Sequence, residues 1–540
     1  MTEMVLLGDE AVALGAVHAG LTASYAYPGT PSTEITEYLL RYTARHGKPR
    51  AAWCTNEKTA YEEALGVSLV GRRALVSMKH VGLNVASDPF MNSALISIHG
   101  GLVVVVADDP GMHSSQNEQD TRYYADFARV ICLEPANQQE AYEMTREAFD
   151  LSEKFHIPVV IRLVTRLAHS RAIVRLGAQR DENPVSKAAD WKQWTLLPNN
   201  ARAQWRSLLE RQKDFLAYAE STDHNPLTLT DRHDIGIITT GLARNYYMEN
   251  VPDLGATPSH LHIGAYPIPV GKIRELASQV AKVLVLEEGY PLVERYLRGI
   301  IPPGIAIAGK ESGDVPADGE LTPDIVRRAL GLRVGTGVEL PAGVTLANRP
   351  PQLCDGCPHA DSLDALHEAL KQCDTSLVTS DIGCYTLGAL PPYSAVESCV
   401  CMGASVGMAK GAAEAGFHPA VGVIGDSTFL HSGITPLIDA VAANTDMTLV
   451  IVDNQAVAMT GGQQTMLPSS SLKPLVLGLG VDPEHCHVLK AHRTATKANI
   501  EIIKKELDYH GLSVIITVRE CIETLKAKKK DAAAAKETRA

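Results

Sequence analysis

The chain contains 540 residues, of which 50 are basic and 62 are acidic, so its formal net charge is −12. This acidic balance argues against a nucleic-acid-binding protein, because such proteins need a basic surface to neutralise phosphates. Hydrophobic residues make up 45% and charged residues 21%, which excludes a disordered chain. The best candidate for an apolar span, residues 101–107, is too short to cross a membrane, and the first residues lack the basic leader of a signal peptide. We therefore expect a cytoplasmic protein without a membrane span.

The first predicted domain covers residues 1–185, where short apolar runs alternate with amphipathic helical patterns. This βαβα alternation is typical of a doubly wound α/β fold with a mostly parallel sheet. At about 150 residues per domain, the whole chain has room for three or four such units. The predicted strands are 74–78, 102–107, 130–133 and 158–163, and the predicted helices are 32–45, 57–70 and 138–154.

Two further α/β units are predicted, at 233–334 and 352–525. The segment 186–232 carries three of the four tryptophans among charged, helix-prone residues, which indicates a helical connecting segment. Glycine and proline at 335–351 indicate a linker, and the Lys- and Ala-rich residues 526–540 indicate a flexible tail. The predicted strands are 233–241, 281–288, 376–380, 420–424, 447–452 and 513–518, with helices at 360–371, 406–415 and 499–509.

The most informative stretch lies in the last of these units. One apolar strand ends in Gly425-Asp426-Ser427, a helix follows, and the next strand ends in Asp453-Asn454. In a βαβ unit both strand ends emerge at the same carboxyl edge of the sheet, where open α/β folds bind ligands. Asp and Asn there offer the oxygen ligands that Mg²⁺ takes beside a phosphate. Ordinary capping residues are the alternative, but the paired endings at this separation favour a metal site.

Cysteines form the second group of candidate ligands. Cys354 and Cys357 form a CxxC pair, Cys384 follows in a later loop, and Cys521 ends the last predicted strand. The CxxC pair is compatible with a zinc site, a redox pair or an iron–sulfur site, and His359 would complete a Cys₃His zinc shell. Spacing alone leaves cluster and zinc equally open. The other cysteines are predicted to be buried small hydrophobes, the last two of them least certainly: Cys54, Cys132, Cys373, Cys486, Cys399 and Cys401.

The third candidate site lies in the first domain. YPGTPSTE, residues 27–34, closes a strand with a turn and begins a helix, whose amino terminus can hold a carboxylate or a phosphate. NEKTAYEE places Glu57 and two further glutamates on one helix, and periodicity does not choose among them. The segments 78–84 and 108–120 follow strands and bring polar groups to the same sheet edge. Each is compatible with an ordinary turn, but together they indicate the mouth of a site.

These motifs, in this order, closely resemble those of the large subunit of the indolepyruvate:ferredoxin oxidoreductases, in the 2-oxoacid:acceptor oxidoreductase family. The resemblance covers nearly all of residues 5–521. It implies a thiamine-diphosphate-binding fold with a pyrimidine-binding domain, a transketolase-C-like middle domain and a diphosphate-binding domain. The matching motifs are YPGTPSTE, NEK, MKHVGLN, DDPGMHSSQNEQD, LCDGCPH, DIGCYTLG, GDSTFLHSG and DNQAVAMTGGQQ.

The resemblance also implies residue roles. Asp426, Asn454 and the backbone carbonyl of Ala456 would hold the Mg²⁺ that grips the diphosphate. Glu57 would bond the aminopyrimidine ring, and Thr30 matches a threonine that faces the substrate carboxylate. The remaining candidates are Gly425, Ser427, Gly461 and Gly462 around the diphosphate, and His80 and His113 as substrate-side contacts or structural histidines.

The four cysteines Cys354, Cys357, Cys384 and Cys521 match the proximal [4Fe–4S] ligands of related two-subunit oxoacid oxidoreductases. The resemblance therefore favours the cluster over zinc, and it implies coenzyme A as co-substrate and ferredoxin or a similar protein as acceptor. A smaller subunit is expected as a separate partner, in a dimer of heterodimers. The family's large subunit usually continues into a ferredoxin-like domain with repeated CxxCxxCxxxC runs, which does not follow Cys521 here.

The resulting hypothesis is oxidative, coenzyme A-dependent decarboxylation of a 2-oxoacid, with an aryl pyruvate such as indolepyruvate fitting best. The alternative is a non-oxidative thiamine-diphosphate-dependent decarboxylase with a structural zinc or with cysteines that hold no metal. A third hypothesis, a non-catalytic scaffold subunit, is disfavoured because the GDS…DN pairing and Glu57 are intact.

Overall fold

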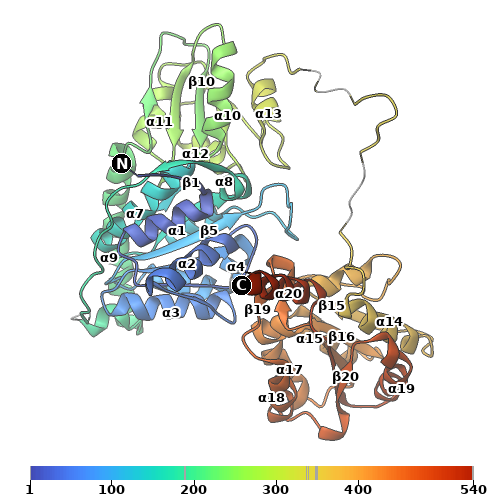
Figure 1. Ribbon diagram of the computed structural model, residues 1–540. Coiled ribbons are helices and arrows are strands. Elements are labelled where there is room, and N and C mark those ends of the chain that lie inside the picture. Colours follow the sequence, from blue (N-terminus) through green and yellow to red (C-terminus); the bar gives the residue numbers. More distant parts are fainter. Residues whose placement is uncertain (1, 188–189, 336, 338–339, 347–350, 538–540) are drawn as a thin grey trace. The chain divides into compact units, whose positions relative to one another are not determined.

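The computed structural model in Figure 1 describes residues 2–187, 190–335, 337, 340–346 and 351–537. The chain separates into two compact units, Met1–Glu339 and Leu340–Ala540. Each unit is built around mostly parallel sheets, so the predicted doubly wound α/β fold class is confirmed. Among the described residues, no helix combines the length and the apolar character that crossing a membrane requires.

The first unit opens with a seven-stranded sheet in the order β12-β6-β7-β5-β4-β2-β3. Its neighbouring strands pair in parallel, except that β12 is antiparallel to β6. The central strand LVVVVAD is buried along its whole length, which explains its unbroken apolar run. The strands are β2 (Ala23–Ala26), β3 (Arg50–Trp53), β4 (Ala74–Lys79), β5 (Leu102–Asp108), β6 (Cys132–Leu133), β7 (Val159–Val164) and β12 (Ala265–Tyr266).

Asparagine side chains cap two of the helices that follow these strands, α3 and α7. The Asn56 side chain accepts a hydrogen bond from the Thr59 amide at 2.9 Å, and Asn137 does the same for Glu140 at 2.9 Å. Such caps satisfy amide groups that have no partner inside the helix. The helices are α1 (Gly8–His18), α2 (Thr33–His46), α3 (Glu57–Leu69), α4 (His80–Val85), α5 (Ser87–Ser93), α6 (Thr121–Ala128), α7 (Gln138–Phe155) and α8 (Thr165–His169).

A second sheet of the same unit has the order β14-β13-β10-β11-β9 and corresponds to the predicted middle domain. Helix α9 (Pro198–Ser221) lies in the predicted connecting segment. The boundaries at 185, 232 and 334 stay predictions, because the compact units divide only after residue 339. The elements are β9 (Leu227–Thr228), β10 (Gly236–Thr240), β11 (Ser259–Ile263), β13 (Lys282–Leu286), β14 (Ala306–Ala308), α10 (Ala243–Asn250), α11 (Val270–Ala277), α12 (Leu292–Ile300) and α13 (Pro323–Ala329).

The second unit contains a five-stranded parallel sheet in the order β15-β16-β17-β21-β20. The strands are β15 (Leu377–Ser380), β16 (Ala420–Gly425), β17 (Met447–Asp453), β20 (Cys486–Lys490) and β21 (Leu512–Val518), with a hairpin of β18 (Ala456–Val457) and β19 (Gln463–Gln464). The helices are α14 (Pro358–Leu370), α15 (Ala404–Glu414), α16 (Asp426–Thr428), α17 (Ile434–Ala442), α18 (Leu472–Gly478) and α19 (Thr496–Leu507).

Two features differ from the sequence-based expectation. Strand β1 (Glu3–Leu7) pairs antiparallel with β8 (Arg171–Arg175), which the sequence did not predict. Helix α20 (Ile522–Glu537) occupies most of the stretch where the sequence predicts a flexible tail. Alanine and lysine are good helix formers, so this composition supports a helix without a core to join. Residues 538–540 lie outside the described part of the chain.

Candidate active site

The carboxyl ends of β16 and β17 bring two polar segments of the second unit together. The strands are neighbours, with Gly425 opposite Val452, so Asp426 emerges beside the segment that follows β17. The Gln455 amide donates a hydrogen bond to Asp426 Oδ2 at 3.0 Å. Asn454 is 4% exposed, and its side-chain oxygen accepts a hydrogen bond from the Ala456 amide at 3.2 Å. The three predicted magnesium ligands are thus gathered at one sheet edge.

This group of oxygen atoms fits a divalent cation. Burial and the neighbouring Asp453 carboxylate both raise the pKa of Asp426 well above its usual range. Asp453 Oδ2 and Ser427 Oγ are buried without a hydrogen-bond partner among the described residues. A divalent cation would stabilise both carboxylates in their charged forms, and Mg²⁺ takes oxygen ligands of this kind.

Close packing explains one of the predicted glycines. A Cβ at position 425 would lie 2.7 Å from a ring carbon of Tyr385, which is 2% exposed. Gly461 and Gly462 have φ values of 129° and 84°, a backbone region that favours glycine, and they lie between the two strands of the β18–β19 hairpin. Contact of these glycines with a phosphate stays a prediction.

The four predicted cluster ligands also lie together in the second unit. Burial, together with the neighbouring Cys357, Cys521 and Cys354 thiols, raises the pKa of Cys384 to about 12. The Cys521 amide donates a hydrogen bond to the Asn454 carbonyl at 2.9 Å. The group of thiols therefore borders the group of oxygen atoms around Asn454.

His359 and the four cysteines do not form a closed zinc shell among the described residues. Tetrahedral zinc, with Zn–S bonds of about 2.3 Å, brings its sulfur ligands to about 3.8 Å from one another. Across the described residues, no three cysteine sulfurs lie within 4.8 Å of one another, and no ring nitrogen of His359 completes such a group. His359 is 3% exposed, and burial lowers its pKa to about 4. The cluster at these four cysteines stays a prediction.

The remaining cysteines divide into two sets. Six further cysteines were predicted to be buried small hydrophobes. For three of them the prediction is wrong, because the structure exposes them at least in part: Cys373, Cys399 and Cys401. Cys399 and Cys401 are exposed in an irregular segment before α15, and Cys373 is half-buried in the turn after α14, so all three lie outside the packed helices and strands. The buried set is Cys54, Cys132 and Cys486.

Glu57 is the buried glutamate of its helix in the first unit. It is 5% exposed, whereas Glu62 and Glu63 are exposed. Burial therefore distinguishes Glu57 from the other two glutamates, which periodicity alone did not. Gly82 of α4 packs directly against it, because a Cβ at that position would lie 2.5 Å from Glu57 Oε1. The NEK and MKHVGLN motifs therefore meet at one point of the structure.

The turn that carries Thr30 lies at the carboxyl end of β2. The Gly29 amide donates a hydrogen bond to Thr33 Oγ1 at 3.0 Å, and Ser32 Oγ donates one to the Gly29 carbonyl at 2.8 Å. These bonds fix the turn and leave Thr30 half-buried. Lys79 passes beside it, since a Cβ at position 29 would lie 3.1 Å from the Lys79 Cβ. Sequence analysis does not single out Lys79, because most lysines are exposed and nothing local marks a buried one.

The two predicted histidines lie in different environments. His80 is 1% exposed, burial lowers its pKa, and its Nε2 lies 3.2 Å from the Asn117 carbonyl. The His113 side chain is 52% exposed, and its Nε2 lies 3.4 Å from a carboxylate oxygen of Glu320. Their roles toward a substrate stay predictions.

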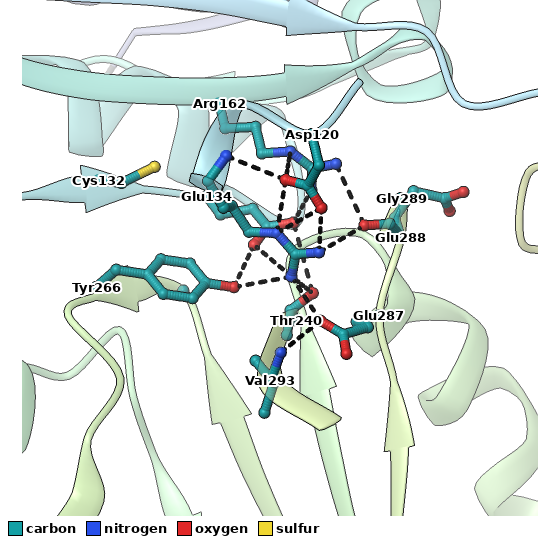
Figure 2. A network of polar contacts seen from close by, with 12 residues as sticks. Asp120, Cys132, Glu134, Arg162, Thr240, Tyr266, Glu287, Glu288, Gly289 and Val293 are labelled. Carbon is teal, nitrogen blue, oxygen red and sulfur yellow. Dashed lines mark hydrogen bonds and ion pairs between the residues drawn. The ribbon is translucent and has the colours of Figure 1, made fainter. Parts of the chain in front are cut away.

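A buried ionic network joins the first sheet to the middle domain (Figure 2). Arg162 on β7 contacts Asp108 at 2.6 Å and Glu134 at 2.5 Å. Arg122 on α6 contacts Asp120 at 2.5 Å and Glu287, directly after β13, at 2.9 Å. These residues are scattered along the chain, so only the folded structure reveals them as a group.

The network also fixes the loop of the DDPGMHSSQNEQD motif. Asp108 and Asp120 stand at the two ends of this loop, and each contacts a buried arginine. The Tyr290 amide donates a further hydrogen bond to Asp120 Oδ2 at 3.0 Å. Both ends of this loop, which follows β5, are therefore fixed by buried contacts.

Two family models match the chain. The model described as "Pyruvate flavodoxin/ferredoxin oxidoreductase, thiamine diP-bdg" matches residues 14–203. The model described as "Thiamine pyrophosphate enzyme, C-terminal TPP binding domain" matches residues 381–517. With the fold, these matches define a thiamine diphosphate enzyme of the 2-oxoacid oxidoreductase class.

Curated relatives identify the family within that class. The indolepyruvate oxidoreductase subunit IorA of Archaeoglobus fulgidus is 37% identical over 96% of this chain and 86% of its own length. The subunits of Methanothermobacter marburgensis and Thermococcus kodakarensis are 38% and 36% identical, also over 96% of this chain and over 87% and 86% of their own lengths. The chain belongs to the family of indolepyruvate oxidoreductase subunits IorA, which confirms the resemblance.

A solved structure supports the fold. It is that of a 2-oxoglutarate:ferredoxin oxidoreductase from Magnetococcus marinus with 2-oxoglutarate, coenzyme A and succinyl-CoA bound. It aligns with 61% of this chain and 65% of its own, with a TM-score of 0.51 and 17% identity. At this level of identity the likeness shows a shared α/β fold alone.

Proposed function

We propose that this chain is the thiamine-diphosphate-binding subunit of an oxidoreductase that decarboxylates an aryl 2-oxoacid such as indolepyruvate. Its products are an acyl-CoA and CO₂, and its electrons pass through a [4Fe–4S] cluster to ferredoxin or a similar acceptor. The hydrogen bond from Cys521 to the Asn454 carbonyl carries the proposal, because it links the candidate cluster ligands to the candidate cofactor ligands. The names of the relatives support the aryl substrate.

The residues of the second unit hold the diphosphate end of the cofactor. Asp426, Asn454 and the Ala456 carbonyl bind the Mg²⁺, which relieves the crowding of the buried carboxylates. When bound, thiamine diphosphate supplies the electron-accepting ring that decarboxylation of a 2-oxoacid requires. In the first unit, Glu57 bonds the aminopyrimidine, and Gly82 leaves the space in which its carboxylate sits.

The overall reaction balances without a further reactant. Each oxoacid anion and coenzyme A thiol give one acyl-CoA, one CO₂, one proton and two electrons, because the thiol sulfur replaces the carboxylate on the acyl carbon. An iron–sulfur cluster carries electrons singly, so a ferredoxin-type acceptor takes them in two steps. The relatives are named as subunits, which supports a partner subunit. In the proposed complex this partner is smaller, and the two chains form a dimer of heterodimers.

Metal analysis of the complex, purified without oxygen together with the smaller subunit, tests the cluster. We expect about four iron atoms and four acid-labile sulfides per chain at this site. Cys521→Ser should lose most of both. Cys373→Ser removes a half-buried cysteine outside the group and should keep them.

An activity assay completes the test. Reduction of a low-potential acceptor should require both the oxoacid and coenzyme A. Zinc without iron, together with aldehyde release that needs neither coenzyme A nor an acceptor, would replace the proposal with the non-oxidative decarboxylase. Full activity of Asp426→Ala would leave only the non-catalytic scaffold.

A further inference from the structure

Lys79 is a buried lysine at the ligand-binding edge of the first sheet. It is the last residue of β4 and is 7% exposed. The carboxyl ends of parallel strands are where open α/β sheets bind their ligands. Its Nζ donates one hydrogen bond, to the Ser114 carbonyl at 2.7 Å, and no carboxylate oxygen of the described residues lies within 4.0 Å of it. An ammonium group has three donors, so two of them remain available.

The acid that acts electrostatically on Lys79 is Asp109, and its oxygens are engaged elsewhere. Asp109 Oδ2 accepts hydrogen bonds from the Ser114 amide at 2.8 Å and from Ser115 Oγ at 2.6 Å. Its Oδ1 accepts one from Thr165 Oγ1 at 2.7 Å. Asp109 therefore attracts the ammonium group without forming an ion pair with it.

The other neighbours of Lys79 leave its charge unpaired. His80 follows directly, and its imidazole supplies no negative charge; burial together with the Lys79 charge lowers the pKa of this histidine. Gly29 contributes only backbone beside the lysine stem. Burial lowers the pKa of Lys79 itself to about 8, against the opposing pull of Asp109. A buried ammonium group without an ion pair costs free energy unless an anion completes its surroundings.

We propose that Lys79 binds the carboxylate of the 2-oxoacid substrate. The inference rests on the proposed function, since a 2-oxoacid carries a carboxylate until it is decarboxylated, and an ammonium group forms strong hydrogen bonds with it. The diphosphate of the cofactor already has candidate ligands at Asp426 and Asn454. The Lys79 stem packs against Gly29, and Thr30 is the next residue in the chain. Both candidate donors, Lys79 and Thr30, therefore lie at the turn that follows β2.

Steady-state kinetics of the complete complex test this with Lys79→Met, Lys79→Arg and the control Lys154→Met, which removes an exposed lysine of α7. Lys79→Met should raise the KM for the oxoacid about 10- to 100-fold, the range for a lost hydrogen bond to a charged group. The Kd of thiamine diphosphate and the KM for coenzyme A should stay unchanged. Lys79→Arg should restore part of the loss.

The pH profile adds a measurement that a merely structural lysine would not change. In the wild type, the KM for the oxoacid should rise above about pH 8, where the Lys79 amine loses its proton. Lys79→Arg should abolish this rise, because a guanidinium stays charged throughout.

Unreactive ligands separate binding from turnover. An arylpropionate and its amide differ only in the charge of the terminal group, and calorimetry measures the affinity of each. The wild type and Lys154→Met should prefer the carboxylate by about 10-fold or more, and Lys79→Met should lose that preference. If Lys79→Met does not fold, Lys79→Gln is measured in the same way.

The outcomes distinguish the inference from the proposed function. Equal preference for the carboxylate in the wild type and the Lys79 variants would overturn the inference. So would a rise in the Kd of thiamine diphosphate or in the KM for coenzyme A instead of the KM for the oxoacid. A wild-type complex that prefers the carboxylate through Lys79 but reduces no acceptor would overturn the proposed function alone.

Discussion

At the scale of single residues, Gly82 stands where only a hydrogen atom fits beside Glu57. A Cβ there would lie 2.5 Å from Glu57 Oε1 and 2.7 Å from its Cγ. Gly82→Ala should displace the carboxylate from the place where the proposal has it bond the cofactor. We expect acceptor reduction to fall about 100-fold, the scale of a lost proton-transfer group, with little change in the unfolding temperature.

Gly66→Ala is the matched control for that substitution. Gly66 lies on α3, the helix that Glu57 begins, and a Cβ there would meet nothing within 4 Å. Alanine in a helix interior is more stable than glycine by about 1 kcal/mol, so this variant should keep its activity and unfold at a slightly higher temperature. Equal activity of the two variants would contradict the placement of Glu57.

The candidate site was predictable where its residues are neighbours in the chain or end neighbouring strands. Asp426 and Asn454 follow consecutive strands with a helix between them, so the βαβ rule alone brings them together. Lys79 and Arg162 were not predictable, because a basic residue in a sequence carries no mark of its burial. Their surroundings come from segments far apart in the chain.

At the scale of elements, Arg519 ties the CxxC loop to the end of β21. Its Nη2 donates a hydrogen bond to the Gly356 carbonyl at 2.7 Å, and its Nη1 lies 2.5 Å from Asp361 Oδ2 on α14. Cys521 follows two residues later, so this arginine holds cysteines from the two ends of the second unit together. Arg519→Met should lower iron per chain by more than half on purification without oxygen, with the cysteines themselves unchanged.

Arg493→Met provides the control, because Arg493 contacts the same Asp361 at 3.5 Å but is 85% exposed. An exposed ion pair of this kind contributes about 0–1 kcal/mol, so the variant should keep its iron. Loss of iron in both variants would show that iron binding depends on the charge balance at Asp361 and not on the hydrogen bond from Arg519 to the CxxC loop.

Elements were predictable where the signal is local. The buried parallel strands β5, β16 and β17 are recognisable in the sequence as unbroken apolar runs. The β1–β8 pair joins segments about 170 residues apart, and its residues are largely exposed, so neither apolar pattern nor turn chemistry marks it. In α20 the run of lysines indicated a solvated tail, while the alanines beside it favour a helix.

At the scale of the first unit, the ionic network between its two sheets carries more negative than positive charge. Two arginines, Arg122 and Arg162, contact Asp108, Asp120, Glu134 and Glu287, all of them buried. The backbone carbonyl of Glu288 accepts hydrogen bonds from both guanidinium groups, while its carboxylate accepts one from the Leu321 amide at 2.9 Å. The Glu288 carboxylate is therefore a fifth acid of this network, and Lys310 and Arg166 are further cations that act on it.

Burial raises the pKa of Glu288 to about 7; the Leu321 amide, Lys310 and Arg162 oppose the rise and Glu320 adds to it. The folded chain therefore keeps this proton between about pH 4.5 and 7, whereas the unfolded chain releases it. Stability should fall as pH rises through this window, by about 3 kcal/mol at most for this group, and the loss should level off above pH 7.

Glu288→Gln keeps the acceptor for the Leu321 amide and removes the titration. The free energy of unfolding of this variant, measured in urea and taken relative to the wild type, should therefore rise from pH 5 to pH 7 and stay constant above that. Glu275→Gln, an exposed glutamate on α11 of the same domain, should show no such rise. A constant difference between Glu288→Gln and the wild type across this range would mean that the network stabilises the charged carboxylate.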